Sequence, residues 1–240
     1  MFKIKLVNMN IGIIGYGKMG KAIEKIAIQK GHNITLKINS KNKDDLKIVN
    51  TFNIDVAIEF SHPQSAFNNI QFCLQNNIPV VSGTTGWLNQ IEKVKKTCIK
   101  YNSSFLYAPN FSIGTNIFFK INNYISNLMN TKNYKISIEE KHHIMKKDKP
   151  SGTAIKIQND IYQNMRKLHT KNTEKIPIIS KRMGQIKGEH IVKYFSEIEE
   201  IKISHKALSR KGFAEGALLG AEFIYDKTGI FTMNDIINNL

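Results

Sequence analysis

The stretch Ile11-Gly12-Ile13-Ile14-Gly15-Tyr16-Gly17-Lys18-Met19-Gly20 decides which fold is expected of this chain. Its apolar beginning predicts a buried strand, and the spacing of Ile23, Ile26 and Ala27 predicts a helix over Lys18–Gln29 that Gly31 ends. The three glycines between strand and helix permit a tight turn, close approach of a phosphate and close packing of the helix. The turn therefore predicts a dinucleotide site, with a purely structural turn as the alternative, at Gly15, Tyr16, Gly17, Lys18, Met19 and Gly20.

Strands and helical patterns alternate through the first 110 residues. The predicted strands are Ile11–Gly15, Ile34–Ile38, Asp55–Phe60, Val80–Ser82 and Phe105–Tyr107. This alternation predicts an α/β fold with a doubly wound parallel sheet of the Rossmann type. A helix over Gly212–Tyr225 is expected to pack back on the sheet, so residues 1–110 and 211–240 are assigned to one dinucleotide-binding domain.

The pattern changes from Phe111 onward. Apolar and polar residues alternate over Asn133–Glu140, as in a half-buried strand, and helical spacing follows over Ser151–Leu168. Further strands are predicted at Ile176–Arg182, Glu189–Phe195 and Glu199–Ala207. One long helix among strands without regular alternation predicts a smaller α+β domain over residues 111–210.

The formal net charge of +16 would suit a nucleic-acid-binding protein. However, the 32 Lys greatly outnumber the 3 Arg and are dispersed along the chain, whereas nucleic-acid surfaces favour Arg. No nucleic-acid partner is therefore expected, and the positive field should instead favour small anions.

The sequence shows no apolar run long enough to span a membrane, and its first residues lack the features of a signal peptide. Cys73 and Cys98 form neither a metal-binding spacing nor a disulfide framework. These features predict a cytoplasmic protein without a membrane partner.

The end of the second predicted strand, Lys37-Ile38-Asn39-Ser40-Lys41-Asn42-Lys43, carries no acid. A site that prefers NAD usually has Asp or Glu there, which bonds the ribose 2′-hydroxyl. Asn39 can form this bond without repelling a 2′-phosphate, and Lys37, Lys41 or Lys43 would attract one. NADH and NADPH are therefore both candidate cofactors, and solvated lysines without a ligand are the alternative.

Two more segments follow predicted strands, at the edge where open α/β sheets bind ligands. The first is Gly83, Thr84 and Thr85, and the second is Ala108, Pro109, Asn110 and Phe111. The hydroxyl and N–H groups of the first suit a nicotinamide ribose or amide, but an ordinary turn has the same composition. The second segment lies where the pattern of the chain changes, so it is either a binding loop or a hinge.

The segments His142-His143-Ile144-Met145-Lys146 and Pro150-Ser151-Gly152-Thr153 bring acid-base groups close to a predicted helix start. Ser151 is a natural N-cap, and the amides after it form a carboxylate site. Neighbouring strand residues point to opposite faces, so no metal is expected on the two imidazoles, although Glu140 lies near. Ordinary core or surface histidines are the other alternative. A general acid, a cation and an anion site together favour an active site for a small anionic substrate.

Motifs along nearly the whole chain resemble those of the 4-hydroxy-tetrahydrodipicolinate reductase family, long called dihydrodipicolinate reductase. Besides the glycine-rich turn, they are Val56–Ser61, Val81–Gly86, Ala108–Gly114, Glu140 with His142-His143-x-x-Lys146, Pro150–Thr153, Gly188–His190 and His205–Arg210. The string of histidines, lysine and Ser-Gly-Thr is highly specific for that family.

The resemblance implies NAD(P)H-dependent reduction of 4-hydroxy-tetrahydrodipicolinate to tetrahydrodipicolinate in the diaminopimelate route to lysine. It implies that His142 and Lys146 transfer protons, and that the substrate, a dicarboxylate, is bound by His143, Gly152 and Thr153. The glycine-rich turn, Gly83–Thr85 and Ala108–Phe111 would bind the cofactor of an interrupted Rossmann domain. The sheet of the second domain builds a homotetramer in the family. Asn39 departs from the acid that many members carry.

Two rival interpretations remain open. Another two-domain Rossmann reductase, such as an amino-acid dehydrogenase, would share the glycine-rich turn, but the His-His-x-x-Lys string argues against it. A basic binding protein could keep the fold without chemistry, but the acid-base cluster beside a capped helix argues against that.

Overall fold

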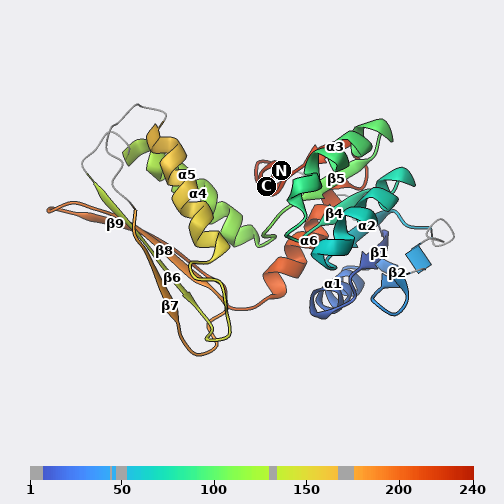
Figure 1. Ribbon diagram of the computed structural model, residues 1–240, viewed down its shortest axis with the longest axis horizontal. Coiled ribbons are helices and arrows are strands. Elements are labelled where there is room, and N and C mark those ends of the chain that lie inside the picture. The colour runs from blue at the N-terminus through green and yellow to red at the C-terminus, as the bar shows by residue number, and fades with distance from the viewer. Residues whose placement is uncertain (1–7, 44, 47–52, 130–133, 167–175) are drawn as a thin grey trace. The chain divides into compact units, whose positions relative to one another are not determined.

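The computed structural model divides the chain into two compact units, each with its own sheet (Figure 1). Residues 1–113 and 211–240 form the first unit, and residues 114–210 form the second. The sequence placed this boundary after residue 110. The structure describes residues 8–43, 45–46, 53–129, 134–166 and 176–240.

The first unit is built around a six-stranded sheet in the order β10-β5-β4-β3-β1-β2. Its strands are β1 (Asn10–Ile14), β2 (Asn33–Ile38), β3 (Val56–Glu59), β4 (Val80–Ser82), β5 (Ser104–Tyr107) and β10 (Gly229–Phe231). All five pairings between these strands are parallel. The predicted Rossmann-type fold is therefore confirmed.

Helices cover both faces of this sheet. On one face lie α1 (Lys18–Gln29), α6 (Lys211–Ile224) and α7 (Met233–Ile237), whose apolar side chains share a core with β1 and β3. On the other lie α2 (Pro63–Gln75), the 3-10 turn η2 (Leu88–Gln90) and α3 (Ile91–Lys100), in a core that includes Trp87. The helix near the C-terminus therefore packs on the first sheet, as its sequence predicts.

The edge strand β10 is one element that the sequence did not predict. It has three residues and pairs with β5 at the edge of the sheet. The predicted strand β4 is equally short but is a largely apolar, fully buried run, whereas β10 begins with a glycine and is half-buried or exposed, so only its pairing with β5 reveals the strand.

The second unit is a four-stranded sheet in the order β7-β6-β8-β9, with two helices packed on it (Figure 1). Its strands are β6 (Lys135–His142), β7 (Ile178–Arg182), β8 (Glu189–Phe195) and β9 (Glu200–Lys206). β6 pairs with β7 in parallel, and the other two pairings are antiparallel. The helices α4 (Ile113–Met129) and α5 (Gly152–Arg166) share a core with Ile138, Val192 and Tyr194 of the sheet.

The prediction of one long helix in this part of the chain was wrong, because α4 is a second one. The buried face of α4 mixes Phe118 and Phe119 with polar Asn122 and Ser126, which weakens its apolar period. Other elements supply partners for some of these groups: the hydroxyl of Tyr194 donates to Oδ1 of Asn122 at 2.8 Å. The ends of two predicted elements, Asn133 and Leu168, lie outside the described residues.

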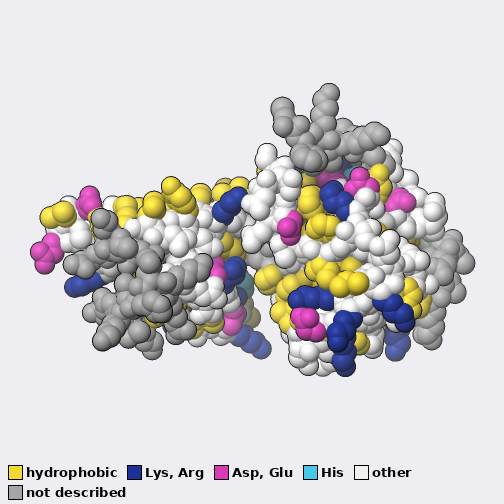
Figure 2. Space-filling view, turned by 90° about the horizontal axis from the view of Figure 1, so that it is seen from above, with side chains coloured by type: hydrophobic (Ala, Val, Ile, Leu, Met, Phe, Trp, Pro, Cys, Tyr) yellow, Lys and Arg dark blue, Asp and Glu magenta, His cyan; other side chains and the backbone are white. Residues whose placement is uncertain are grey.

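Among the described residues, no helix is both long enough and apolar enough to cross a membrane. On the face drawn in Figure 2, Lys and Arg side chains are spread over both units, with acidic side chains among them. The described residues on that face therefore form no continuous basic stripe of the kind typical of nucleic-acid-binding surfaces.

Candidate active site

The glycine-rich turn between β1 and α1 is shaped to receive a phosphate. Gly15 has a φ of +99°, and a Cβ there would lie 2.0 Å from the carbonyl oxygen of Phe60. A Cβ on Gly20 would lie 2.6 Å from the carbonyl oxygen of Gly15, so this glycine lets α1 pack closely. Around Gly17, a Cβ would meet nothing within 4 Å, and no side chain caps α1. The open space and uncapped N–H groups fit the pyrophosphate of a dinucleotide.

Phe60, just after β3, brings the three predicted cofactor segments together. Its backbone lies against Gly15, and a Cβ on Gly83 would lie 2.1 Å from its ring. The ring centroid of Phe111 lies 5.6 Å from that of Phe60. The sequence alone does not single out Phe60, because its contacts come from three segments that are far apart in the chain.

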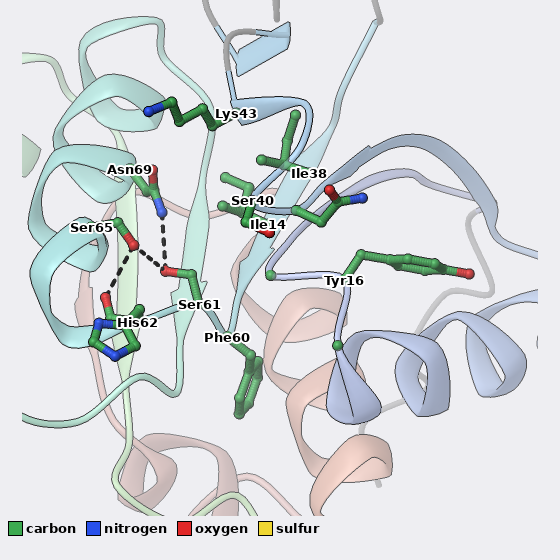
Figure 3. A pocket seen from close by; sticks show the side chains of 13 residues that line it. Ile14, Tyr16, Ile38, Ser40, Lys43, Phe60, Ser61, His62, Ser65 and Asn69 are labelled. Atoms are coloured by element: carbon green, nitrogen blue, oxygen red, sulfur yellow. Dashed lines mark hydrogen bonds between the residues drawn. The ribbon is translucent and has the colours of Figure 1, made fainter.

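A cavity of about 580 Å³ opens beside the glycine-rich turn (Figure 3). It is lined by Ile14, Gly15, Tyr16, Gly17, Ile38, Asn39, Ser40, Lys43, Phe60, Ser61, His62, Ser65 and Asn69. Four predicted cofactor residues therefore face one cavity. On one wall, Nδ2 of Asn69 donates to Oγ of Ser61 at 3.1 Å, and the Oγ atoms of Ser61 and Ser65 are 3.1 Å apart. This polar row, which the sequence did not reveal, offers a nucleotide further hydrogen-bond partners.

Hydrogen bonds hold the turn after β2. The backbone N–H of Asn39 donates to Oδ1 of Asn42 at 2.8 Å, and Oδ1 of Asn39 accepts from the backbone N–H of Lys41 at 2.8 Å. Lys37 pairs with Glu24 of α1 and lies 5.3 Å from the ring centroid of Tyr16. Of the three lysines considered for a 2′-phosphate, all of them described, Lys43 lines the cavity.

The two threonines after β4 differ in their surroundings. Thr84 is buried, and its hydroxyl donates to Oε1 of Glu59 at 2.9 Å, while Ser82 donates to Oε2 at 2.7 Å. The indole N–H of Trp87 donates to the carbonyl oxygen of Thr84 at 2.7 Å. Thr84 therefore holds the turn in place, whereas Thr85 is exposed.

The segment after β5 continues along the same edge of the sheet. The backbone N–H of Ala108 donates to the carbonyl oxygen of Ser82 at 3.2 Å. Pro109 is exposed and Asn110 is half-buried, with its Oδ1 accepting from the backbone N–H of Ser112 at 2.9 Å. A Cβ on Gly216 of α6 would lie 1.8 Å from the carbonyl oxygen of Phe111, so α6 packs tightly behind this segment.

In the second unit, alternation along β6 places the acid-base groups. Ile138, Glu140 and His142 are buried, whereas His143, just after the strand, is half-buried. His190 of β8 pairs directly with Glu140, and its ring centroid lies 5.1 Å from that of His142. The sequence does not reveal the contact of His190 with this cluster, because only the register of two distant strands brings it there.

His142 is held between Glu140 and Gly188. Its Nδ1 lies against Oε2 of Glu140, and a Cβ on Gly188 would lie 3.2 Å from its Nε2. Burial lowers the pKa of His142 below its ordinary value; the carboxylate of Glu140 opposes this and the ammonium of Lys146 adds to it. A neutral imidazole that directs Nδ1–H at Glu140 leaves Nε2 as the atom that exchanges a proton. Burial also lowers the pKa of His190, to about 3.

Lys146 and the start of α5 form an anion site. The ammonium of Lys146 lies 2.8 Å from Oδ1 of Asp148, and the backbone N–H of Gly152 also bonds this carboxylate. The hydrogen bond from Lys146, more than the bond from Gly152, holds the pKa of Asp148 below its usual range. A Cβ on Gly152 would meet nothing within 4 Å, so the helix start is open. The predicted ammonium and amide are thus arranged around a carboxylate.

Ser151 caps α5 as its sequence predicts. Its Oγ accepts from the backbone N–H of Ala154 at 3.2 Å and lies 3.2 Å from Nε2 of His190. Thr153 is half-buried in the first turn of the helix. The cap therefore joins the anion site to the histidine cluster.

The atoms of Glu140, His142 and His190 that could bind a metal lie within 4.8 Å of one another. However, Nη1 of Arg182 donates to Oε1 of Glu140 at 3.0 Å, and Oε2 faces His142. A metal ion there would meet the positive charges of Arg182 and Lys146. The cluster is therefore better suited to proton transfer than to holding a metal.

A Rossmann-type unit with an open glycine-rich turn and a second unit with an acid-base cluster define a class, the two-domain oxidoreductases that use a pyridine nucleotide. The family model described as the N-terminus of dihydrodipicolinate reductase matches residues 9–111, and the model of its C-terminus matches residues 114–237. The chain belongs to the dihydrodipicolinate reductase family.

Individual relatives agree with this assignment. The chain is 45% identical to the 4-hydroxy-tetrahydrodipicolinate reductase of Christiangramia forsetii, over 97% of this chain and 99% of that protein. It is 37% identical to the reductase of the same name from Wigglesworthia glossinidia brevipalpis, over 98% and 95%. A dipicolinate-bound dihydrodipicolinate reductase from Paenisporosarcina sp. TG-14 has the same fold, with a TM-score of 0.81, 22% identity, and coverage of 98% and 100%. The predictions of the family, the fold class and the reductase function that defines the family are confirmed.

Proposed function

We propose that this chain reduces 4-hydroxy-tetrahydrodipicolinate to tetrahydrodipicolinate, with NADH or NADPH as hydride donor, in the diaminopimelate route to lysine. His142 and Lys146 transfer protons, and His143, Gly152 and Thr153 bind the dicarboxylate. The cofactor is held by Gly15–Gly20, Asn39, Gly83–Thr85 and Ala108–Phe111. The open space at Gly17 and the cavity beside it support this placement.

The proposed reaction needs a proton as well as a hydride. The 4-hydroxyl of the substrate leaves as water, together with a hydrogen of the neighbouring ring carbon, and a bound nicotinamide would supply a hydride to the ring carbon that lost the hydroxyl. The negative charge left on the ring is neutralised by a proton from Nε2 of His142 or from Lys146, an effect typically worth about 10²–10⁴-fold in rate. Burial favours the neutral form of His142, and the two carboxylates of the substrate would restore its proton when they bind.

One observation carries the assignment of the substrate site. The carboxylate of Asp148 is bound by the ammonium of Lys146 and the backbone N–H of Gly152, so the site can hold a carboxylate. These groups lie on the same short segment as His142, whose Nδ1 faces a carboxylate. A carboxylate-binding site next to a poised imidazole suits a dicarboxylate that must accept a proton.

Three finer points complete the proposal. Lys43 at the cavity, together with an asparagine where NAD-specific sites carry an acid, supports dual use of NADH and NADPH. The exposed Ile179 on β7 lies on the face of the second sheet opposite the helices and supports assembly into a homotetramer through that sheet. The free, buried thiols of Cys73 and Cys98 support a cytoplasmic location.

Steady-state oxidation of NADH and NADPH with 4-hydroxy-tetrahydrodipicolinate tests the proposal. Turnover with this substrate is expected, and it should be lost in His142→Gln. Absence of turnover in the wild-type protein, or turnover only with an amino acid and NAD⁺, would contradict it.

A further inference from the structure

The carboxylate of Glu140 is fully buried, and positive or hydrogen-bonding groups surround it. Its Oε1 accepts from Nη1 of Arg182 at 3.0 Å, and its Oε2 lies against Nδ1 of His142. Burial raises the pKa of Glu140, but the hydrogen bonds from Ser180, Arg182 and Ser151 and the charge of His142 together outweigh this and hold the pKa below its usual range. Glu140 is therefore an ionised carboxylate fixed between a guanidinium and an imidazole.

The remaining atoms of Arg182 hold the loop that follows β6. Nε of Arg182 donates to the carbonyl oxygen of Lys146 at 3.3 Å, and Nη2 donates to the carbonyl oxygen of Asp148. One guanidinium thus bonds both the carboxylate behind His142 and the backbone of the segment that carries Lys146. Arg182 reaches this place because it pairs with His142 in the parallel ladder of β6 and β7.

We propose that Arg182 and Glu140 are positioning residues that couple the two proton-transfer groups of the site. Glu140 orients the imidazole of His142 and supports its charged form. Arg182 fixes Glu140 and, through the backbone of Lys146, sets where the ammonium lies relative to that imidazole. This inference rests on the proposed roles of His142 and Lys146.

The geometry requires an arginine in particular. A guanidinium has five N–H donors in a rigid planar fork, so it can bond a carboxylate and two carbonyl groups at once. A lysine ammonium at this position would keep the positive charge but could not donate hydrogen bonds to all three of these acceptors in the same geometry. Positioning errors of about 1 Å commonly cost about 100-fold in rate, so loss of the fork should be visible in turnover.

The charges around His142 make the proposal measurable. The groups that act on its pKa are Glu140 on its own strand, which raises it, and Lys146 and Arg182, which lower it. The neighbouring His190 stays neutral because burial lowers its pKa to about 3. Removing the charge of Arg182 should therefore raise the pKa of His142, and removing the charge of Glu140 should lower it.

The first experiment separates geometry from charge by kinetics. Arg182→Lys should lower kcat by about 10- to 100-fold, with little change in the KM for NADPH. The matched control is Lys181→Met, which removes the neighbouring ion pair with Glu139 at 3.1 Å. The control should keep kcat within about twofold. Wild-type kcat in Arg182→Lys, or an equal loss in the control, would overturn the proposal.

The second experiment measures the pKa of His142 directly, from the NMR signal of its ring that disappears in His142→Gln. The pKa should rise in Arg182→Met, fall in Glu140→Gln and stay unchanged in Arg182→Lys. If Arg182→Met does not fold, Glu140→Gln tests the same point with an isosteric side chain. A pKa that moves in neither variant would overturn the proposal. The titration needs no substrate, so it is independent of whether the wild-type protein shows the proposed activity.

Discussion

Replacing Asp148 with asparagine should tighten the binding of pyridine-2,6-dicarboxylate, a planar dianion that resembles the proposed substrate. Oδ1 of Asp148 lies 2.8 Å from Nζ of Lys146, and the Asp148 carboxylate also accepts a hydrogen bond from the backbone N–H of Gly152. A dianion that uses the same ammonium and amide must displace this carboxylate or lie beside it. The substitution removes the competing charge and keeps the shape of the side chain.

The exposure of the pair sets the size of the effect. The side chains of Lys146 and Asp148 are 24% and 54% exposed, so solvent screens their attraction. Such pairs are worth about 0.2–1 kcal/mol. In the variant the inhibitor no longer competes with this ion pair, so its inhibition constant should fall by about 1.5- to 5-fold. Added salt should make this decrease smaller.

The assay is competitive inhibition of NADPH oxidation at low and high ionic strength. Asp160→Asn is the matched control, because it removes the same charge from an ion pair with Lys156 at 2.9 Å on α5. The control should leave the inhibition constant unchanged. If Asp148→Asn weakens the inhibitor or has no effect, the anion site is not the one formed by Lys146 and Gly152.

Four other outcomes are expected. His142→Gln should lower turnover by about 10²-fold or more with a modest change in the KM for NADPH, and turnover near that of the wild type would refute its role. Thr153→Val should weaken pyridine-2,6-dicarboxylate by about 1–3 kcal/mol in calorimetry, whereas equal affinity would remove its hydroxyl from the site. Lys43→Met should lower kcat/KM about fivefold for NADPH at low salt and less for NADH, and equal losses would exclude a contact with the 2′-phosphate. The free energy of unfolding, measured with urea, should fall as the pH drops from about 6.5 to about 3, because the unfolded chain protonates His190 before the folded protein does. The slope from this group is at most about 1.4 kcal/mol per pH unit, and His190→Asn should flatten it; an unchanged slope would contradict the low pKa.

Structural features that depend only on residues close together in the chain could be predicted from the sequence. The helix over Lys18–Gln29 has the predicted bounds, since its apolar period and the glycine that ends it are local. The cap at Ser151 and the closeness of His142 to Lys146 are likewise local. The glycine-rich turn was also predictable, because its three glycines lie together between one strand and the helix that follows it. Gly20 is crowded by Gly15 of the same turn, whereas the backbone that crowds Gly15 belongs to Phe60, farther along the chain.

Local patterns failed where the buried face of an element is not apolar, or where a short strand is not a buried apolar run. The helix α4 was missed because Asn122 and Ser126 lie on its buried face, and their partners come from other elements. The strand β10 was missed because its evidence is its pairing with β5. In both cases the stabilising contacts are made with residues far away in the chain.

The sequence by itself therefore determined the family of this protein, its Rossmann-type fold and the segment that holds the candidate acid, cation and anion site. Only the tertiary structure decided what surrounds His142. The ladders of β6 with β7 and β8 bring Arg182 beside His142 and His190 opposite Glu140. The physical reason is that strand register joins residues with no shared local pattern, and a buried carboxylate such as Glu140 is stable only where that register supplies its partners.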